Sequence, residues 1–417
     1  MSKLMIEGCN RLNGSISVQG AKNSALPVLA ATLLSGDRCV LHNCPRLSDV
    51  ETSIKILRYL GCNVSRSGST LTVDTHSVCR YDIPDALMRE MRSSIVFLGA
   101  IIATMGRARL SFPGGCELGP RPIDLHLKAL RLMGLEITEH HGILDCSVPN
   151  GLHGAKITLS FPSVGATENI MLSAVLAKGT TIITNAAREP EICDLADFLN
   201  GCGAKISGAG EGTIFIDGVE RLTGTQHTII PDRIVTATYM AAAAVTGGSL
   251  ELKHVVPAHL GSIISVFEEA GCTIRISGNT LHIFAPQRLK AVKFIRTMPY
   301  PGFPTDAQAP IMAMTALANG TSVFVENIFE SRYKHVGELL RLGANIKVEG
   351  RVAVVEGVKH FYGASVEALD LRGSAALVVA ALAAEGTTEL KGVKFLERGY
   401  EDIELYLSSV GATVKKV

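Results

Sequence analysis

Apolar, alanine-rich stretches of helical length alternate along the whole chain with short β-branched runs that favour strands. At 177–183, for example, an apolar stretch ends at Gly179 and a Thr-Thr-Ile-Ile run follows it. Glycine readily adopts the left-handed conformation that ends helices, so each such junction predicts a helix C-terminus and then a strand. The polar turn 277–279 between runs 274–276 and 281–284 predicts a β-hairpin.

Two glycine landmarks recur six times in phase, at a period of about 70 residues. The high glycine content alone does not account for six occurrences of both. The first set consists of Gly61, Gly134, Gly203, Gly271, Gly343 and Gly411, and the second of Gly36, Gly106, Gly179, Gly248, Gly320 and Gly386. Each repeat is predicted to hold two glycine-capped helices and four strands in the order β-α-β-α-β-β.

The two ends of the chain complement each other. The sixth repeat lacks its last strand because the sequence stops at Val417, and residues 5–14 resemble the repeat end at 215–224. Residues 1–20 are therefore predicted to complete the last repeat. We expect two α/β lobes of three repeats each: 22–229 forms one, and 1–21 together with 230–417 forms the other.

The composition of the chain indicates a large folded protein and argues against several functional classes. At 417 residues the chain is long enough for two or three domains, and 47% apolar with 19% charged residues excludes disorder. The balance of 40 basic and 39 acidic residues argues against a nucleic-acid or membrane-surface protein. Ten cysteines without a CxxC pair, and no signal peptide or membrane span, predict reduced thiols in a cytoplasmic protein.

Charged residues recur where the first strand of a repeat meets the first helix, as at Lys22, Arg92, Asp306 and Arg372. Helix N-termini offer unpaired N–H groups and a partial positive charge, which suit anions. An Asp or Ser at any single junction is often only a helix cap. Six junctions together favour an anion-binding site between the lobes. No spacing typical of a metal site or of a nucleotide-cofactor loop is present, so no metal or cofactor is predicted.

Segment 112–124 surrounds one thiol, Cys116, with glycine and proline. Buried cysteines normally lie among apolar residues, so Cys116 is a candidate reactive group. Arg121 and Glu117 would act on such a thiol in opposite directions, and the sequence leaves that balance open. Taken alone, a loop cysteine is more often inert than catalytic.

Seven motifs, in order along the whole chain, resemble the UDP-N-acetylglucosamine 1-carboxyvinyltransferases, the enolpyruvyl transferases that open bacterial peptidoglycan synthesis. The motifs are Gly20-Ala21-Lys22-Asn23, Pro113-Gly114-Gly115-Cys116, Gly119-Pro120-Arg121-Pro122-Ile123-Asp124-Leu125-His126, Ser163-Val164-Gly165-Ala166-Thr167, Asn185-Ala186-Ala187-Arg188-Glu189-Pro190-Glu191, Phe303-Pro304-Thr305-Asp306 and Arg398-Gly399-Tyr400-Glu401. The resemblance implies two inside-out α/β barrels of three repeats each, with the active site in the cleft between them.

The implied reaction transfers the enolpyruvyl group of phosphoenolpyruvate to the 3′-hydroxyl of UDP-N-acetylglucosamine. It proceeds by addition–elimination, releases phosphate and needs no metal or cofactor. This is the first committed step of cell-wall synthesis, in the cytoplasm. A single chain with both lobes also suggests a monomer.

The resemblance assigns roles to individual residues. Cys116 would be the general acid at the enolpyruvyl methylene, and Asp306 the base near the sugar hydroxyl. Lys22, Arg121 and Arg398 would be the cations on the phosphate side. Further substrate-binding matches are Asn23, Arg92, Pro122, Ile123, Asp124, Leu125, Ser163, Val164, Gly165, Ile328 and Arg372. The acidic matches are Glu189, Glu191, Asp232 and Asp370, which would hold cationic side chains in place.

One departure and three alternatives remain. Phe161 stands where some family members carry a lysine, which leaves one diphosphate contact open. The nearest alternative is 5-enolpyruvylshikimate-3-phosphate synthase, whose pattern lacks the Cys116 loop and the uridine segment at 121–125. A DNA sliding clamp would need basic helices around its hole. An inactive paralogue would have lost catalytic positions, and the matched positions here are intact.

Overall fold

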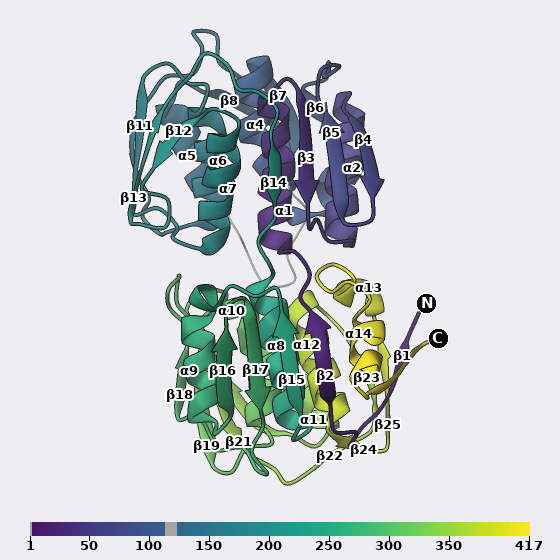
Figure 1. Cartoon of the computed structure of the whole chain (residues 1–417). Coiled ribbons are helices and arrows are strands. Elements are labelled where there is room, and N and C mark those ends of the chain that lie inside the picture. The colour runs from purple at the N-terminus through teal and green to yellow at the C-terminus, as the bar shows by residue number, and fades with distance from the viewer. Residues whose placement is uncertain (1, 113–122) are drawn as a thin grey trace. The chain divides into compact units, whose positions relative to one another are not determined.

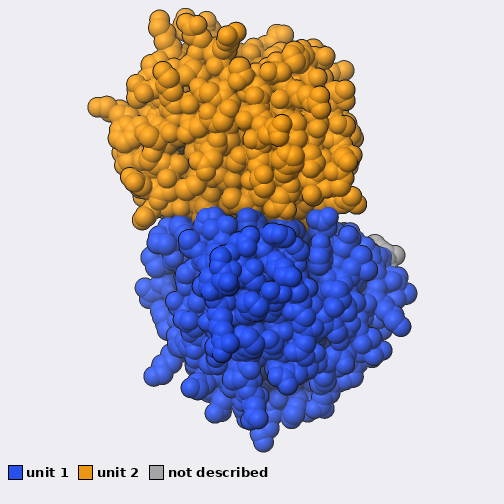
Figure 2. All heavy atoms as spheres, in the orientation of Figure 1, with its two compact units in different colours: residues 1–19, 117–119, 231–417 blue, residues 20–116, 120–230 orange. Residues whose placement is uncertain are grey.

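The computed structural model describes residues 2–112 and 123–417 (Figure 1). The chain divides into two compact units, coloured separately in Figure 2. Unit 1 contains the described residues 2–19 and 231–417, and unit 2 contains 20–112 and 123–230. Each unit has a hydrophobic core of its own. Within the described part of the chain, no helix is long and apolar enough to cross a bilayer.

The same four-stranded sheet occurs three times in the described residues of each unit. In every copy the first strand of the repeat pairs in parallel with the second. The second pairs antiparallel with the fourth, and the fourth antiparallel with the third. An example is the order β18 (Phe294–Arg296), β19 (Thr321–Val325), β21 (Val352–Glu356) and β20 (Asn345–Glu349). In repeats two, three, five and six a first helical segment connects strands one and two. In repeats one and four the first strand comes from another part of the chain, because β2 (Asn13–Ser17) leads into α1 (Lys22–Ala31) but pairs with β15 (Ser249–Lys253), and β14 (Gln226–Thr228) leads into α8 (Arg233–Val245) but pairs with β3 (Arg38–His42). A second helical segment connects strands two and three in every repeat.

Unit 2 contains repeats one to three. Repeat one consists of β14 (Gln226–Thr228), α1 (Lys22–Ala31), η1 (Thr32–Leu34), β3 (Arg38–His42), α2 (Ser48–Leu60), β4 (Asn63–Ser67) and β5 (Thr70–Asp74). Repeat two consists of β6 (Asp82–Ile83), α3 (Asp85–Glu90), η2 (Arg92–Val96), α4 (Phe97–Met105), β7 (Arg107–Ser111), α5 (Asp124–Leu132), β8 (Glu136–His140) and β9 (Ile143–Ser147). Repeat three consists of β10 (Lys156–Thr158), α6 (Val164–Ala174), β11 (Thr180–Thr184), α7 (Pro190–Gly201), β12 (Lys205–Ser207) and β13 (Thr213–Asp217).

Unit 1 contains repeats four to six. Repeat four consists of β2 (Asn13–Ser17), α8 (Arg233–Val245), β15 (Ser249–Lys253), η3 (Pro257–Leu260), α9 (Gly261–Glu269), β16 (Thr273–Ser277) and β17 (Thr280–Phe284). Repeat five consists of β18 (Phe294–Arg296), α10 (Thr305–Thr315), β19 (Thr321–Val325), α11 (Val336–Arg341), β20 (Asn345–Glu349) and β21 (Val352–Glu356). Repeat six consists of β23 (Ser365–Glu367), α12 (Leu371–Leu382), β25 (Thr387–Lys391), α13 (Val393–Leu396), α14 (Ile403–Ser409), β26 (Thr413–Lys416) and β1 (Leu4–Glu7), and β22 (Phe361–Tyr362) pairs separately with β24 (Ala384–Glu385).

The N-terminal segment supplies strands to two different sheets of unit 1. β1 lies between β25 and β26 and is antiparallel to both, with Ile6 opposite Thr388 and Val414. β2 instead pairs in parallel with β15, as the first strand of repeat four. The prediction that residues 1–20 belong wholly to the last repeat is therefore wrong for β2. The likeness of 5–14 to 215–224 arises because a last strand leads into the next first strand in both places, β1 into β2 and β13 into β14.

The first helices of the repeats lie inside the units. In unit 1, α8, α10 and α12 contact one another, and almost all of their residues are buried. In unit 2, α4 contacts both α1 and α6. A helix that is apolar on every face has to be buried, and alanine allows close approach between such helices. With helices inside and sheets around them, the structure confirms the predicted fold class (Figure 1).

The glycines of the first landmark follow directly on the ends of the second helices, as the sequence predicts. The second landmark fits less well, because α6, α10 and α12 end several residues before Gly179, Gly320 and Gly386. All six glycines of the first landmark have φ between 93° and 109°. In the second landmark the fourth position differs, because Gly247 has the positive φ of 63° and Gly248 does not. A Cβ atom on Gly248 would lie 2.3 Å from the carbonyl oxygen of Leu12. Gly248 is therefore required for close backbone approach rather than for the turn.

Candidate functional site

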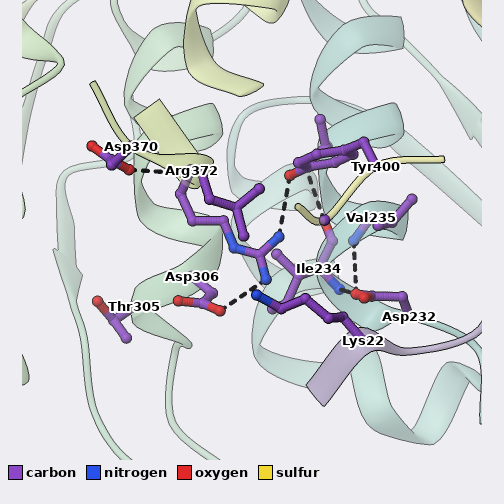
Figure 3. Close-up of polar contacts among 12 residues, drawn as sticks. Lys22, Asp232, Ile234, Val235, Thr305, Asp306, Asp370, Arg372 and Tyr400 are labelled. Carbon is purple, nitrogen blue, oxygen red and sulfur yellow. Dashed lines mark hydrogen bonds and ion pairs between the residues drawn. The ribbon is translucent and has the colours of Figure 1, made fainter. Parts of the chain in front are cut away.

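A carboxylate held by two arginines forms the central feature of unit 1, and Figure 3 shows its contact with one of them, Arg372. Asp306 lies in the first turn of α10, and its Oδ1 accepts from Nη2 of Arg332 at 2.8 Å. Its Oδ2 accepts from Nη2 of Arg372 at 2.9 Å. Both arginine side chains are 2–3% exposed, whereas that of Asp306 is 26% exposed. The carboxylate is thus the accessible member of the cluster, and the buried guanidinium groups fix its orientation.

Further contacts hold Arg372 from its other side. Its Nη1 donates to the Tyr400 hydroxyl at 3.4 Å, and that hydroxyl lies 2.8 Å from Oγ1 of Thr238 (Figure 3). Burial disfavours a charged guanidinium, but the Asp306 carboxylate outweighs this effect and raises the pKa of Arg372 above its ordinary value. Arg372 therefore remains a cation with a fixed position, which suits binding of an anionic group.

The polar residues at three helix starts act as caps. Asp370 accepts through Oδ1 from the backbone N–H groups of Arg372 and Gly373, at 3.0 and 2.9 Å. Asp232 caps α8 in the same way, and the Ser163 hydroxyl caps α6. Capping is thus the described role of these side chains. Through its cap, Asp370 also fixes the backbone of Arg372, so it supports the arginine without an ion pair to its side chain in the described contacts.

Two other residues of unit 1 predicted from the sequence, Ile328 and Arg398, lie in turns that contact the buried side chains of Glu326 and Gln19. The backbone N–H of Ile328 donates to Oε1 of Glu326 at 2.8 Å, and Oε2 of Glu326 accepts from the hydroxyl of Thr305, next to Asp306. Arg398 is half-buried and directly precedes residues 399–401. The side-chain amide of Gln19 holds that segment: its Nε2 donates to the carbonyl oxygen of Gly399 at 3.2 Å, and its Oε1 accepts from the backbone N–H of Glu401 at 2.8 Å.

Unit 2 places the other described candidates at helix starts. Lys22 is the first residue of α1, and its Nζ lies 3.2 Å from Oδ2 of Asp49 in α2. Both side chains are almost fully buried. Asn23 follows Lys22 and is half-buried. The unit therefore presents Lys22 as a paired, positioned cation.

Three further candidate segments of unit 2 are also helix starts. Arg92 begins η2, Asp124 begins α5 after buried Ile123, and Val164 begins α6. Leu125 and Gly165 belong to the same first turns of α5 and α6. A Cβ atom on Gly165 would lie 3.1 Å from Cε1 of His126, so the imidazole of His126 lies directly against the start of α6.

Three of the predicted site residues lie outside the described part of the chain, and two residues of the observed site were not predicted from the sequence. Cys116, Arg121 and Pro122 lie outside the described residues. Arg332 and Asp49 were missed because no periodic landmark marks Arg332, and an acid in a first helical turn such as Asp49 is common without any ligand. Within the described ranges, no three His, Cys, Asp or Glu side chains are grouped so that they could hold a metal ion.

Stability should fall as the pH drops, because two histidines are buried. Burial lowers the pKa of His126 from 6.5 to about 4; the charge of Asp124 opposes this shift and that of Arg92 adds to it. Burial likewise lowers the pKa of His335. Since the unfolded chain binds these protons first, stability is lost as pH falls from the unfolded pKa toward the folded one. For His126 alone, we expect roughly 2 kcal/mol less unfolding free energy at about pH 5 than at about pH 7.

Chemical denaturation at the two pH values would measure this loss. His126→Asn removes the titrating group and should reduce the loss by about the same amount. An equal pH dependence in this variant and the wild type would contradict the assignment to His126.

Comparisons with known proteins agree with this architecture. A family model described as EPSP synthase (3-phosphoshikimate 1-carboxyvinyltransferase) matches residues 6–407. A protein from Caldanaerobacter subterraneus subsp. tengcongensis, named UDP-N-acetylglucosamine 1-carboxyvinyltransferase 2, is 52% identical over 417 residues and covers 100% of both chains. The chain belongs to the UDP-N-acetylglucosamine 1-carboxyvinyltransferase family. The resemblance noted in the sequence is thereby confirmed.

Other members of the UDP-N-acetylglucosamine 1-carboxyvinyltransferase family give the same result. A protein named UDP-N-acetylglucosamine 1-carboxyvinyltransferase 1 from Carboxydothermus hydrogenoformans is 50% identical, covering 100% of this chain and 99% of its own. One of the same name from Symbiobacterium thermophilum is 48% identical, with 100% and 95% covered.

Solved structures share the fold of the family. The enolpyruvyl transferase NikO from Streptomyces tendae superposes with a TM-score of 0.91 at 25% identity, covering 100% of this chain and 99% of that one. EPSP synthase from Acinetobacter baumannii has a TM-score of 0.78 at 19% identity over 100% of both chains, which shows the fold alone.

Proposed function

We propose that this protein transfers the enolpyruvyl group of phosphoenolpyruvate to the 3′-hydroxyl of UDP-N-acetylglucosamine and releases phosphate. The observation that supports this most strongly is the accessible Asp306 carboxylate held by buried Arg332 and Arg372. Relatives at 48–52% identity over the whole chain carry the activity in their names. Such a step commits the sugar nucleotide to peptidoglycan synthesis, and we place it in the cytoplasm.

Asp306 has the properties of the base in this proposal. Its side chain is 26% exposed, so the carboxylate is accessible to a substrate hydroxyl while two arginines hold it in place. The sugar 3′-oxygen forms a bond to C2 of phosphoenolpyruvate, and its proton passes to the carboxylate. Since buried arginines fix the carboxylate, little reorganisation is needed when the proton moves.

The remaining steps need an acid and several cations. Cys116 would donate its proton to the methylene carbon C3, which becomes a methyl group in the tetrahedral intermediate. Elimination then returns one methyl proton to the Cys116 thiolate and breaks the C2–O bond to phosphate, so the enol ether and free phosphate result, and the proton held by Asp306 passes to phosphate or water. Lys22, Arg121, Arg372 and Arg398 would balance the charge of the phosphate and carboxylate. We assign these roles by family match.

The sugar nucleotide would bind to segments of unit 2. Backbone N–H groups at the start of α6, in residues 163–165, suit a diphosphate because helix N-termini carry a partial positive charge. Arg92 and residues 121–125 would bind the rest of the nucleotide, with Asn23 and Ile328 as further contacts. Phe161 is exposed and offers no charge where some relatives have lysine, so backbone groups would carry more of this binding.

A second candidate function comes from the description of the family model, which names 3-phosphoshikimate 1-carboxyvinyltransferase. That enzyme would use the same donor and a different acceptor. We propose that the present chain acts as a monomer, because six repeats within one chain already build both hydrophobic cores.

Phosphate release from phosphoenolpyruvate tests the acceptor directly. The purified protein would be offered UDP-N-acetylglucosamine and shikimate 3-phosphate in separate metal-free reactions. We expect release with the sugar nucleotide alone. Release with shikimate 3-phosphate alone would favour the second function, and release with neither would indicate an inactive paralogue.

A further inference from the structure

A fully buried amide joins three helical segments of unit 2. Asn169 lies in α6 with no exposed surface, and it contacts His126 of α5, which is 7% exposed. Nδ2 of Asn169 lies 2.7 Å from Nδ1 of His126 and donates to the carbonyl oxygen of Ile95 in η2 at 3.0 Å. Its Oδ1 accepts from the backbone N–H of Gly99 in α4 at 2.8 Å. One side chain thus connects α5, α6 and the η2–α4 segment.

These contacts use both N–H donors of the amide and one of the two lone pairs of its oxygen. Both N–H groups of Nδ2 have an acceptor, and Oδ1 has a donor. The opposite amide orientation would place Oδ1 against the carbonyl oxygen of Ile95, so the observed orientation is fixed. Nδ1 of His126 must therefore be the unprotonated acceptor, which leaves the proton of the neutral ring on Nε2.

Each connected segment begins with residues that we assign to the sugar nucleotide. Ile95 belongs to η2, which starts at Arg92. His126 follows Asp124 and Leu125 in the first turn of α5. The ring of His126 also lies against Gly165 at the start of α6, within 3.1 Å of a Cβ position there. The mutual placement of all three segments therefore depends on this pair.

We propose that Asn169 and His126 are positioning residues for the sugar-nucleotide acceptor, which align η2, α5 and α6 so that their first turns bind one nucleotide together. This inference rests on the proposed function, since it assumes that acceptor. Buried groups of this kind act through the residues they orient, and small displacements of binding groups reduce activity strongly.

A kinetic comparison tests the proposal. Asn169→Asp keeps the shape of the side chain but removes the N–H groups that donate to the carbonyl oxygen of Ile95 and to Nδ1 of His126. We expect the KM for UDP-N-acetylglucosamine to rise roughly tenfold or more, with a much smaller change in the KM for phosphoenolpyruvate. Asn200→Asp is the matched control, because Asn200 also bonds a backbone N–H and carbonyl, both of Ile206, through an exposed local contact. Its KM values should stay unchanged.

A conservative variant and a pH series separate positioning from general loss of structure. His126→Asn can place an amide oxygen near the former Nδ1 and should retain most acceptor affinity, whereas His126→Leu should lose it. In Asn169→Asp, a protonated His126 can donate to the new carboxylate. The KM defect of Asn169→Asp should therefore lessen from about pH 8 to about pH 6, while Asp124 and Arg92 act on His126 equally in this variant and in the wild type.

Calorimetric binding of UDP-N-acetylglucosamine distinguishes the two ways of failing. If the wild-type protein binds this nucleotide without turnover, the proposed function is contradicted. The positioning role is then tested by the affinities of the variants for the nucleotide. Folded Asn169→Asp and His126→Leu variants with wild-type affinity would overturn the positioning role. An equal rise of both KM values would do so as well, and wild-type protein that does not bind the nucleotide would overturn both proposals.

Discussion

Asp306→Asn is expected to lose nearly all turnover while the protein remains folded. The amide cannot accept the proton of the attacking hydroxyl, and general acid–base groups contribute roughly 10²- to 10⁴-fold to rates. The fixed geometry adds to the effect. An amide nitrogen would direct its own N–H groups at a guanidinium of Arg332 or Arg372, where the carboxylate had accepted a hydrogen bond from each.

The free energy of unfolding should also fall in this variant, but by less than the loss of a fully buried ion pair would cost. Breaking a buried pair costs about 3–5 kcal/mol, but Asp306 is 26% exposed and water screens part of the charge. Phosphate release, thermal unfolding and calorimetric binding of the sugar nucleotide would be measured together. We expect binding to survive better than turnover.

Asp85→Asn provides the matched control for this loss. Asp85 also lies in the first turn of a helix and pairs with an arginine, Arg89, but that pair is on the surface. Its removal should leave turnover unchanged and have little effect on stability, because water screens an exposed ion pair. If Asp306→Asn released phosphate at the wild-type rate, Asp306 would not be an essential base.

Much of the fold could be predicted because its repeat carries local signals. Glycines with positive φ follow the second helix of each repeat, and apolar helices have to be buried whatever surrounds them. The assignment of β2 failed for a physical reason. It buries Ile16 alone among five residues, so its pattern contains little information about which strand it joins. Its pairing with β15 depends on long-range contacts that no local pattern records.

The candidate site, like the fold, could be predicted only in part from local sequence signals. Asp306 and Arg372 occupy corresponding positions, at the starts of inner helices of adjacent repeats, so the repeat itself suggested that they belong together. Arg332 lies in a segment without regular secondary structure, and only the fold brings it to Oδ1 of Asp306. The roles of Asp232 and Asp370 required the structure too, because a cap and an ion-pair partner look alike in sequence.

Cys116→Ala should abolish turnover with little change in thermal stability. The family match makes the thiol the proton donor to the methylene carbon, and alanine has no proton to give. We expect a loss of roughly 10²-fold or more in turnover, as for other general acids. Both substrates should still bind, because the charged groups assigned to them are unchanged. The measurement is phosphate release together with calorimetric binding.

The control for Cys116 is an exposed thiol among the described residues of unit 2. Cys79 is an exposed free cysteine, so Cys79→Ala makes the same chemical change without touching the assigned acid. It should keep wild-type turnover. The wild-type rate should also fall once the thiol loses its proton at high pH, since a general acid must hold its proton. Normal turnover in Cys116→Ala would remove this thiol from the mechanism and leave the donor of the methyl proton to be sought among other groups.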